Sequence, residues 1–191
     1  MDNDSGINNP VPLWREIVNK YYSAGSRLRY ILLKHSAQVA VLAQKLARRN
    51  NLPLAPSVIE NAAMLHDIGI ILTDAPSIEC HGTEHYLRHG ILGAEILRRC
   101  GADEMYARVA ERHTGSGLTA GEIKAQNMPL PCKDLLPETL LEKLICYADK
   151  FYSKSGDMER KSFDRVRASM ARHGDGALRR FDELVELFGK P

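Results

Sequence analysis

Six residues of the types that ligate transition metals stand among apolar neighbours in this chain. They are His35, His66, Asp67, His89, His113 and Asp149. Each alone has an ordinary explanation. A histidine on an apolar helix face is usually a hydrogen-bonded core residue, and an aspartate near a helix end is usually a cap or an ion-pair partner. The chemistry of interest arises only if the six act together.

Metal binding would explain all six positions at once. Burying polar groups without partners costs several kcal/mol, about 2 to 7 for a neutral group and more for a charged carboxylate. One or two divalent cations would satisfy the whole set. Neutral imidazole and carboxylate are ligands for iron, manganese, cobalt, zinc and nickel, so the sequence predicts a divalent transition-metal site and leaves the metal open.

The order and context of these residues resemble the HD-domain metal-dependent phosphohydrolases, and their HDIG-type members in particular. The segment Met64-Leu65-His66-Asp67-Ile68-Gly69 contains the signature His-Asp pair. The segments that begin at His35 and His89, and the one that ends in Ala148-Asp149-Lys150, are similar to the family's other ligand segments. The resemblance covers about residues 28–155.

The resemblance implies a helical bundle with its metals in the centre. It implies that His35, His66, Asp67 and Asp149 bind a first metal. His89 and His113 would bind a second metal, with Asp67 bridging the two. The implied reaction is hydrolysis of a phosphoester or phosphoanhydride by a metal-activated water.

Within the family, the His113-Thr114 pair and the segment around Asp149 look nearest to the symmetrical diadenosine tetraphosphate hydrolases, which use two irons. Two departures argue against cleavage of cyclic dinucleotides. Ile70 stands where that branch usually has lysine, and Thr114 stands where it has a second histidine. One fewer imidazole would weaken the second metal site.

Four residues are candidates for direct catalytic roles: Asp67, His81, His85 and Lys150. Asp67 could accept a proton from the attacking water. Gly82 argues against a continuous helix aligning His81, His85 and His89 into a separate metal site. We expect a loop overhanging the centre, with His81 or His85 as general acid or phosphate ligand; a polar surface loop is the alternative. Lys150 either reaches a substrate phosphate or is solvated.

The elements that position these residues are predicted to be helices throughout, which makes the fold class all-α. Periodicity and end signals predict helices over about 11–23, 27–49, 56–66, 89–100, 103–113 and 137–152, and a short helix that begins at Thr119-x-x-Glu122. Two more helices are predicted over about 160–188, with a break near His173-Gly174. We expect residues 1–10 to form a flexible arm and 11–191 a single domain.

Composition narrows the setting. The 191 residues carry a formal net charge of +2, so no nucleic-acid partner is expected, and no apolar run is long enough for a membrane span. The polar N-terminus and reduced, structural cysteines (Cys80, Cys100, Cys132 and Cys146) favour a cytoplasmic protein. The expected partner is a small phosphorylated substrate, a nucleotide above all; a homodimer is possible.

Three functions compete on this reading. The leading one is a metal-dependent phosphohydrolase of a nucleotide or another small phosphorylated metabolite. The second is a mixed-valent di-iron oxygenase on the same scaffold. The third is a non-catalytic module that senses a nucleotide.

Overall fold

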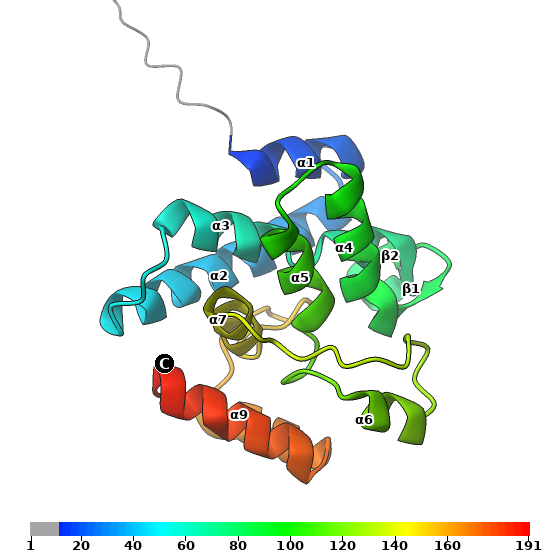
Figure 1. The fold of residues 1–191 in the computed structure, drawn as a ribbon. Helices are drawn as coiled ribbons and strands as arrows, with labels where there is room; N and C mark the ends of the chain where they lie inside the picture. The colour runs from blue at the N-terminus through cyan, green and yellow to red at the C-terminus, as the bar shows by residue number, and fades with distance from the viewer. Residues whose placement is uncertain (1–11) are drawn as a thin grey trace, which may run out of the picture.

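The computed structural model describes residues 12–191, and in that range its nine α-helices confirm the all-α prediction (Figure 1). The helices are α1 Leu13–Tyr21, α2 Arg27–Arg49, α3 Pro56–Leu65, α4 His89–Arg99, α5 Glu104–Arg112, α6 Ala120–Ala125, α7 Leu140–Asp149, α8 Phe163–Arg172 and α9 Asp175–Phe188. Three short 3-10 helices are interspersed: η1 Ile68–Leu72, η2 Pro76–Ile78 and η3 Tyr86–Arg88.

Local chemistry accounts for most helix ends. Ser26 caps α2 by accepting a hydrogen bond from the Arg29 amide, and Thr119 forms a capping box with Glu122. Gly174, at a φ of +102°, separates α8 from α9. Helix α3 begins at Pro56, as predicted, but Ala55 is its N-cap and no side chain caps it, so Ser57 and Glu60 form no capping box.

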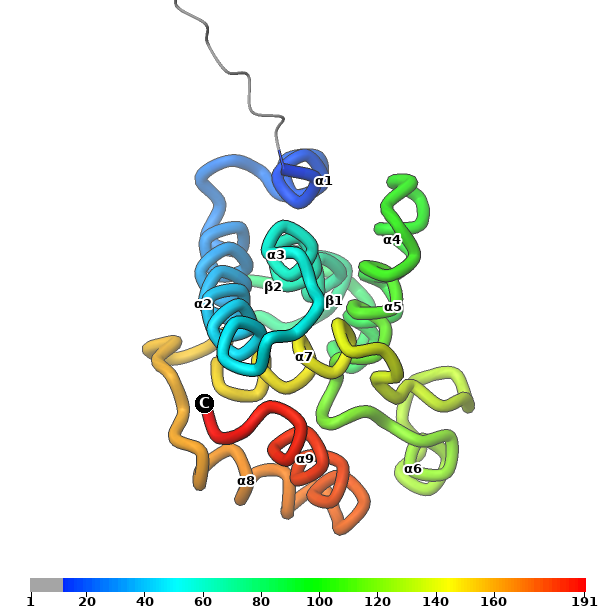
Figure 2. The backbone as a smooth tube through the Cα atoms, turned by 60° about the vertical axis from the view of Figure 1, so that its left-hand side comes forward, coloured from blue at the N-terminus to red at the C-terminus, as the bar shows by residue number. Residues whose placement is uncertain are grey.

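Five helices pack around the centre of the molecule. The long helix α2 packs against α3 and α7, and α5 packs against α3, α4 and α7. Helix α4 also lies against η1, the 3-10 helix that begins directly after Asp67. Both views show α1 at one end of the molecule and α8 and α9 at the other, beyond α7 (Figures 1 and 2).

A small three-stranded sheet contradicts the expectation of a strand-free loop. Strand β1, Thr73–Ala75, pairs antiparallel with β2, Cys80–His81, and parallel with β3, Glu84–His85. Strands of two or three residues leave no alternating pattern for the sequence to reveal. At Gly82 an added Cβ would lie 2.2 Å from the Leu72 carbonyl oxygen, so only glycine allows this close return of the chain.

The remaining predictions concern the length of α7, the cysteines, the N-terminal arm and membrane-spanning segments. Helix α7 is shorter than predicted and begins at Leu140, because residues before Thr139 are extended or turned. The four cysteines are unpaired, as expected. The predicted arm, and Val11 of the first predicted helix, lie outside the described residues. Within residues 12–191, no helix has both the length and the apolar character that a membrane crossing requires.

Candidate metal centre

The six predicted ligands come from helix positions that face the middle of the bundle. His35 lies in the middle of α2, and Asp149 is the last residue of α7. The other four stand at or beside helix ends: His66, Asp67, His89 and His113. Each of the six side chains is buried, and Asp67 and His66 are fully buried. The bundle therefore fixes all six in position.

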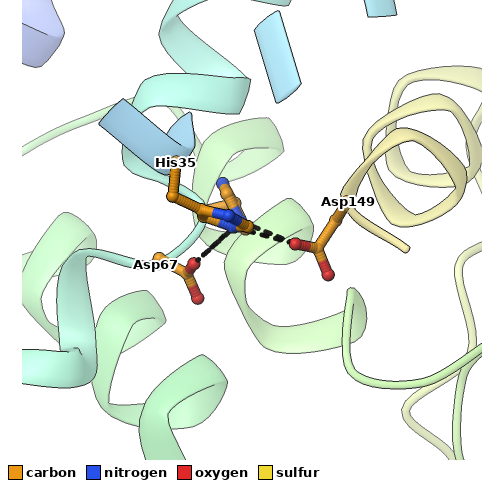
Figure 3. A group of neighbouring side chains, drawn as sticks. His35, Asp67 and Asp149 are labelled. Carbon is orange, nitrogen blue, oxygen red and sulfur yellow. Dashed lines mark hydrogen bonds and ion pairs between the residues drawn. The ribbon is translucent and has the colours of Figure 1, made fainter. Parts of the chain in front are cut away.

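Four of these residues form a first ligand group. The Nε2 atom of His35 lies 3.1 Å from Oδ2 of Asp67 and 2.9 Å from Oδ1 of Asp149. The Nε2 atom of His66 lies 3.0 Å from the same Asp67 oxygen. Figure 3 shows the two carboxylates approaching the His35 ring from different elements. One ligand atom from each of His35, His66, Asp67 and Asp149 lies within 4.8 Å of the others.

A second ligand group uses the other oxygen of Asp67. The Nε2 atoms of His89 and His113 are each 3.4 Å from Asp67 Oδ1 and 3.0 Å from one another. Asp67 is thus the one residue common to both groups. If each group held a cation, Asp67 would supply one oxygen to each.

Backbone contacts orient three of the four imidazoles. The Nδ1 atoms of His66, His89 and His113 lie 2.6, 2.7 and 2.8 Å from the carbonyl oxygens of Ala63, Tyr86 and Ala110, each three residues earlier. A carbonyl oxygen can only accept a hydrogen bond, so it favours the tautomer with the proton on Nδ1, which leaves the Nε2 lone pair directed at the centre. This is the arrangement that metal-ligating histidines need.

The electrostatics also suit a cation. Neither oxygen of the buried Asp67 has a partner with hydrogen-bond geometry. Burial alone would raise its pKa, but His66 and Lys154 outweigh burial and hold that pKa well below its usual range. Burial, and then His113, lower the pKa of His89 to about 3, so this imidazole is neutral at physiological pH. Burial also lowers the pKa of His113. Burial would lower the pKa of His66 too, but Asp67 and Asp149 outweigh burial and raise that pKa to about 9. A divalent cation would replace the His66 proton between the imidazoles and the carboxylates, and this set of ligand types fits such a metal.

Close backbone contacts hold the ligand-bearing segments together. A Cβ at Gly69 would lie 2.2 Å from the His89 carbonyl oxygen, and one at Gly90 would lie 2.5 Å from the Ala110 carbonyl oxygen. The Tyr22 hydroxyl donates to the Ile68 carbonyl at 2.8 Å and so anchors the segment that follows Asp67. These contacts set the spacing between the two ligand groups.

Comparison with known proteins agrees with this geometry. A family model described as the HD domain matches residues 32–153, more than half of the chain. The chain belongs to the HD-domain family. Members of this family are generally metal-dependent hydrolases.

The relatives of this HD domain are only partial matches. It is 39% identical over 121 residues to an uncharacterized protein of Methanocaldococcus jannaschii. The matched stretch is 62% of this chain and 64% of that protein. It is 35% identical over 123 residues to a tRNA (cytidine(56)-2'-O)-methyltransferase of Picrophilus torridus, covering 64% of this chain and 32% of that enzyme. The same enzyme of Thermoplasma volcanium is 31% identical with similar coverage. The chain thus spans about a third of both methyltransferases, and no solved structure matches it.

Two lysines adjoin the metal centre of this HD domain. Lys150 Nζ lies 2.9 Å from Oδ2 of Asp149 and 3.1 Å from the His113 carbonyl oxygen, so the side chain is not simply solvated. Lys154 Nζ lies 2.7 Å from Oδ2 of Asp67, with 12% of its side chain exposed. Sequence reasoning missed Lys154, because it stands in a polar turn five residues after Asp149 and belongs to no periodic pattern.

The structure does not bring His81 or His85 to the ligand groups. Both are exposed. His85 accepts a hydrogen bond from the Leu87 amide, and His81 lies 3.7 Å from Glu79. Ile78 and Tyr86 of this segment do line the cavity beside Asp149, but His81 and His85 do not, so the geometry favours the surface alternative for both histidines.

Proposed function

We propose that this HD-domain protein is a metal-dependent phosphohydrolase acting on a phosphoester or phosphoanhydride of a nucleotide or another small phosphorylated metabolite. The observation that carries the proposal is the shared Asp67 carboxylate, whose two oxygens face two separate ligand groups. Cations bound there would neutralise charge on a phosphoryl group and activate water as a nucleophile.

The residues around the centre support binding of an anion. Lys150 forms an ion pair with Asp149 and Lys154 forms one with Asp67, and both lysines line a cavity beside the ligand groups. That cavity has a volume of about 540 Å³, within the range of about 300 to 1,000 Å³ typical of small-molecule sites. A phosphorylated metabolite of ordinary size therefore has room next to the ligand groups.

We do not propose methyltransferase activity for this protein, since the chain spans only 32% of each methyltransferase. The names of these relatives do suggest one further substrate to test, a phosphate on tRNA. We expect a small molecule instead, because a net charge of +2 gives little attraction for a polyanionic RNA.

The test is phosphate release by the full chain loaded with Mn²⁺, Fe²⁺ or Co²⁺, using a panel of nucleotides, sugar phosphates and tRNA. Asp67→Asn should abolish release and lower the metal content. The matched control Asp164→Asn, at an exposed position in the first turn of α8, should change neither.

Three results would contradict the proposal. The first is a metal-loaded protein that releases no phosphate from any substrate. The second is an iron-loaded protein that consumes oxygen with a carbon substrate, as the oxygenase alternative requires. The third is tight nucleotide binding without turnover, as the sensing alternative requires.

A further inference from the structure

The cavity beside the metal centre extends well past the ligand groups. One side is formed by Asp149, Lys150 and Lys154, and another by the face of α8 that carries Arg165, Ser169 and Arg172. These α8 residues are spaced four and three apart, so they lie along one stripe of the helix. A ligand held at the metal centre would therefore have room to reach α8.

The cavity lining is strongly cationic. Besides His173, five cationic side chains line it: Lys150, Lys154, Lys161, Arg165 and Arg172. Its one carboxylate is Asp149, a candidate metal ligand. The positive field acts on Lys161, whose pKa is lowered by burial and further by Lys150, Lys154 and Arg165, against the opposing effect of Asp149.

The arginines on α8 differ in how their charge is balanced. Arg167, outside the cavity, forms a two-bond ion pair with Asp182 on α9, at 2.9 and 2.7 Å. Among the described residues, Arg165 and Arg172 have no carboxylate within ion-pair distance. The two guanidinium groups that face the cavity are thus the ones left available to an anion.

Guanidinium groups bind phosphate through paired, charge-assisted hydrogen bonds. We propose that the substrate carries a second phosphate group besides the one hydrolysed, and that Arg165 and Arg172 bind this second phosphate at the α8 side of the cavity. The inference rests on the proposed function for the position of the first phosphate. It narrows the substrate to small molecules phosphorylated at two places or bearing a phosphate chain.

A matched pair of probes tests this inference in binding and in turnover. Binding of adenosine 3',5'-bisphosphate and of adenosine 5'-monophosphate to the metal-free full chain is measured by calorimetry in chelator. The wild type should bind the bisphosphate about tenfold more tightly, since the second phosphate gains charge-assisted bonds. In R165A/R172A this preference should vanish. The control R179A, an exposed arginine of α9 outside the cavity, should keep it.

Turnover separates the inference from the proposed function. With Mn²⁺ bound, R165A/R172A should lower kcat/KM for the bisphosphate about tenfold and leave the monophosphate within about twofold. R165K/R172K, which keeps the charge, should be intermediate. If the arginine-dependent binding preference is found but no phosphoester is hydrolysed, the proposed function fails and the binding site stands. If hydrolysis occurs but the double variant leaves the preference intact, or if only an oligonucleotide depends on these arginines, the inference is wrong.

Discussion

The ammonium group of Lys154 lies 2.7 Å from Oδ2 of Asp67, the same oxygen that faces His35 and His66. Lys154 comes from the turn after α7, and Asp67 from the junction between α3 and η1. The contact therefore joins the wall of the cavity to the middle of the metal centre. Because the Asp67 side chain is fully buried, its charge needs this compensation.

We expect Lys154→Met to destabilise the metal-free protein by about 3 kcal/mol, because a buried carboxylate loses its ammonium partner. Added Mn²⁺ should recover most of that loss, since the cation supplies the missing charge. Urea unfolding in chelator and in Mn²⁺ measures both effects. Lys124→Met, at an exposed position on α6, is the control. Equal stability of Lys154→Met and wild type in chelator would show that the contact contributes nothing.

The two ligand groups predict separable metal losses. His89→Gln removes a ligand only from the second group, so it should bind one ion fewer per chain than wild type while the first group retains its ion. His81→Gln, which alters an exposed histidine outside both groups, should bind as many ions as wild type. Elemental analysis after dialysis measures the content. Loss of all metal in His89→Gln, or any loss in His81→Gln, would argue against this division.

Gly69→Ala should disturb the metal centre without changing a ligand, because the added methyl group would collide with the backbone of α4. The added methyl would lie 2.2 Å from the His89 carbonyl oxygen and 2.3 Å from the Gly93 amide nitrogen, and neither atom can move aside cheaply. We expect a loss of about 3 kcal/mol in the free energy of unfolding. Metal affinity should fall as well.

The control is Gly121→Ala on α6, where the nearest atom would be 3.9 Å away. It should be neutral or gain about 0.5 kcal/mol from reduced chain entropy. Chemical denaturation of both variants measures the contrast. A Gly69→Ala protein as stable as Gly121→Ala would mean that the close approach of η1 to α4 is not required.

An ion pair between the buried Glu142 and the partly exposed Arg108, outside the centre, gives a pH-dependent prediction. Glu142 Oε1 accepts a hydrogen bond from Arg108 at 2.8 Å, and Oε2 accepts one from the Glu138 amide at 2.8 Å. Burial would raise the pKa of Glu142, but these bonds outweigh it and lower that pKa. A carboxylate with a lowered folded-state pKa adds stability above its unfolded pKa of about 4.3, and this stability is lost as the pH falls through the folded value.

Glu142→Gln should therefore be less stable than wild type by about 2 kcal/mol at pH 7, because the charged hydrogen bonds weaken. The difference should shrink as the pH falls below about 4. Denaturant unfolding between pH 7 and pH 3.5 measures it. A difference that stays constant or grows toward low pH would contradict this account of the pair.

The sequence predicted those features that repeat or that depend on residue type. The bounds of α2 were anticipated at both ends, because its apolar stripe and the Asn50-Asn51-Leu52-Pro53 terminator are local signals. The convergence of six ligand side chains was also anticipated, since burying that many polar groups demands a common partner.

Other features depend on tertiary contacts that leave no local trace. The strands of the small sheet form because Gly82 lets the chain return against Leu72, and they carry His81 and His85 to the surface. Lys154 reaches Asp67 only through the path of the turn after α7. Arg167 is paired and Arg165 and Arg172 are not, because α9 packs on α8 and brings Asp182 to Arg167 alone. The sequence shows no sign of this packing.

The central claim is that two cations share the Asp67 carboxylate. It is tested most directly by anomalous scattering from crystals of the full chain grown with Mn²⁺, combined with elemental analysis of the same preparation. Two peaks should be found, one ligated by His35, His66 and Asp149 and the other by His89 and His113, each also contacting one oxygen of Asp67. A loaded crystal with fewer than two peaks between α2, α4, α5 and α7, or with its ions held by other residues, would contradict the account.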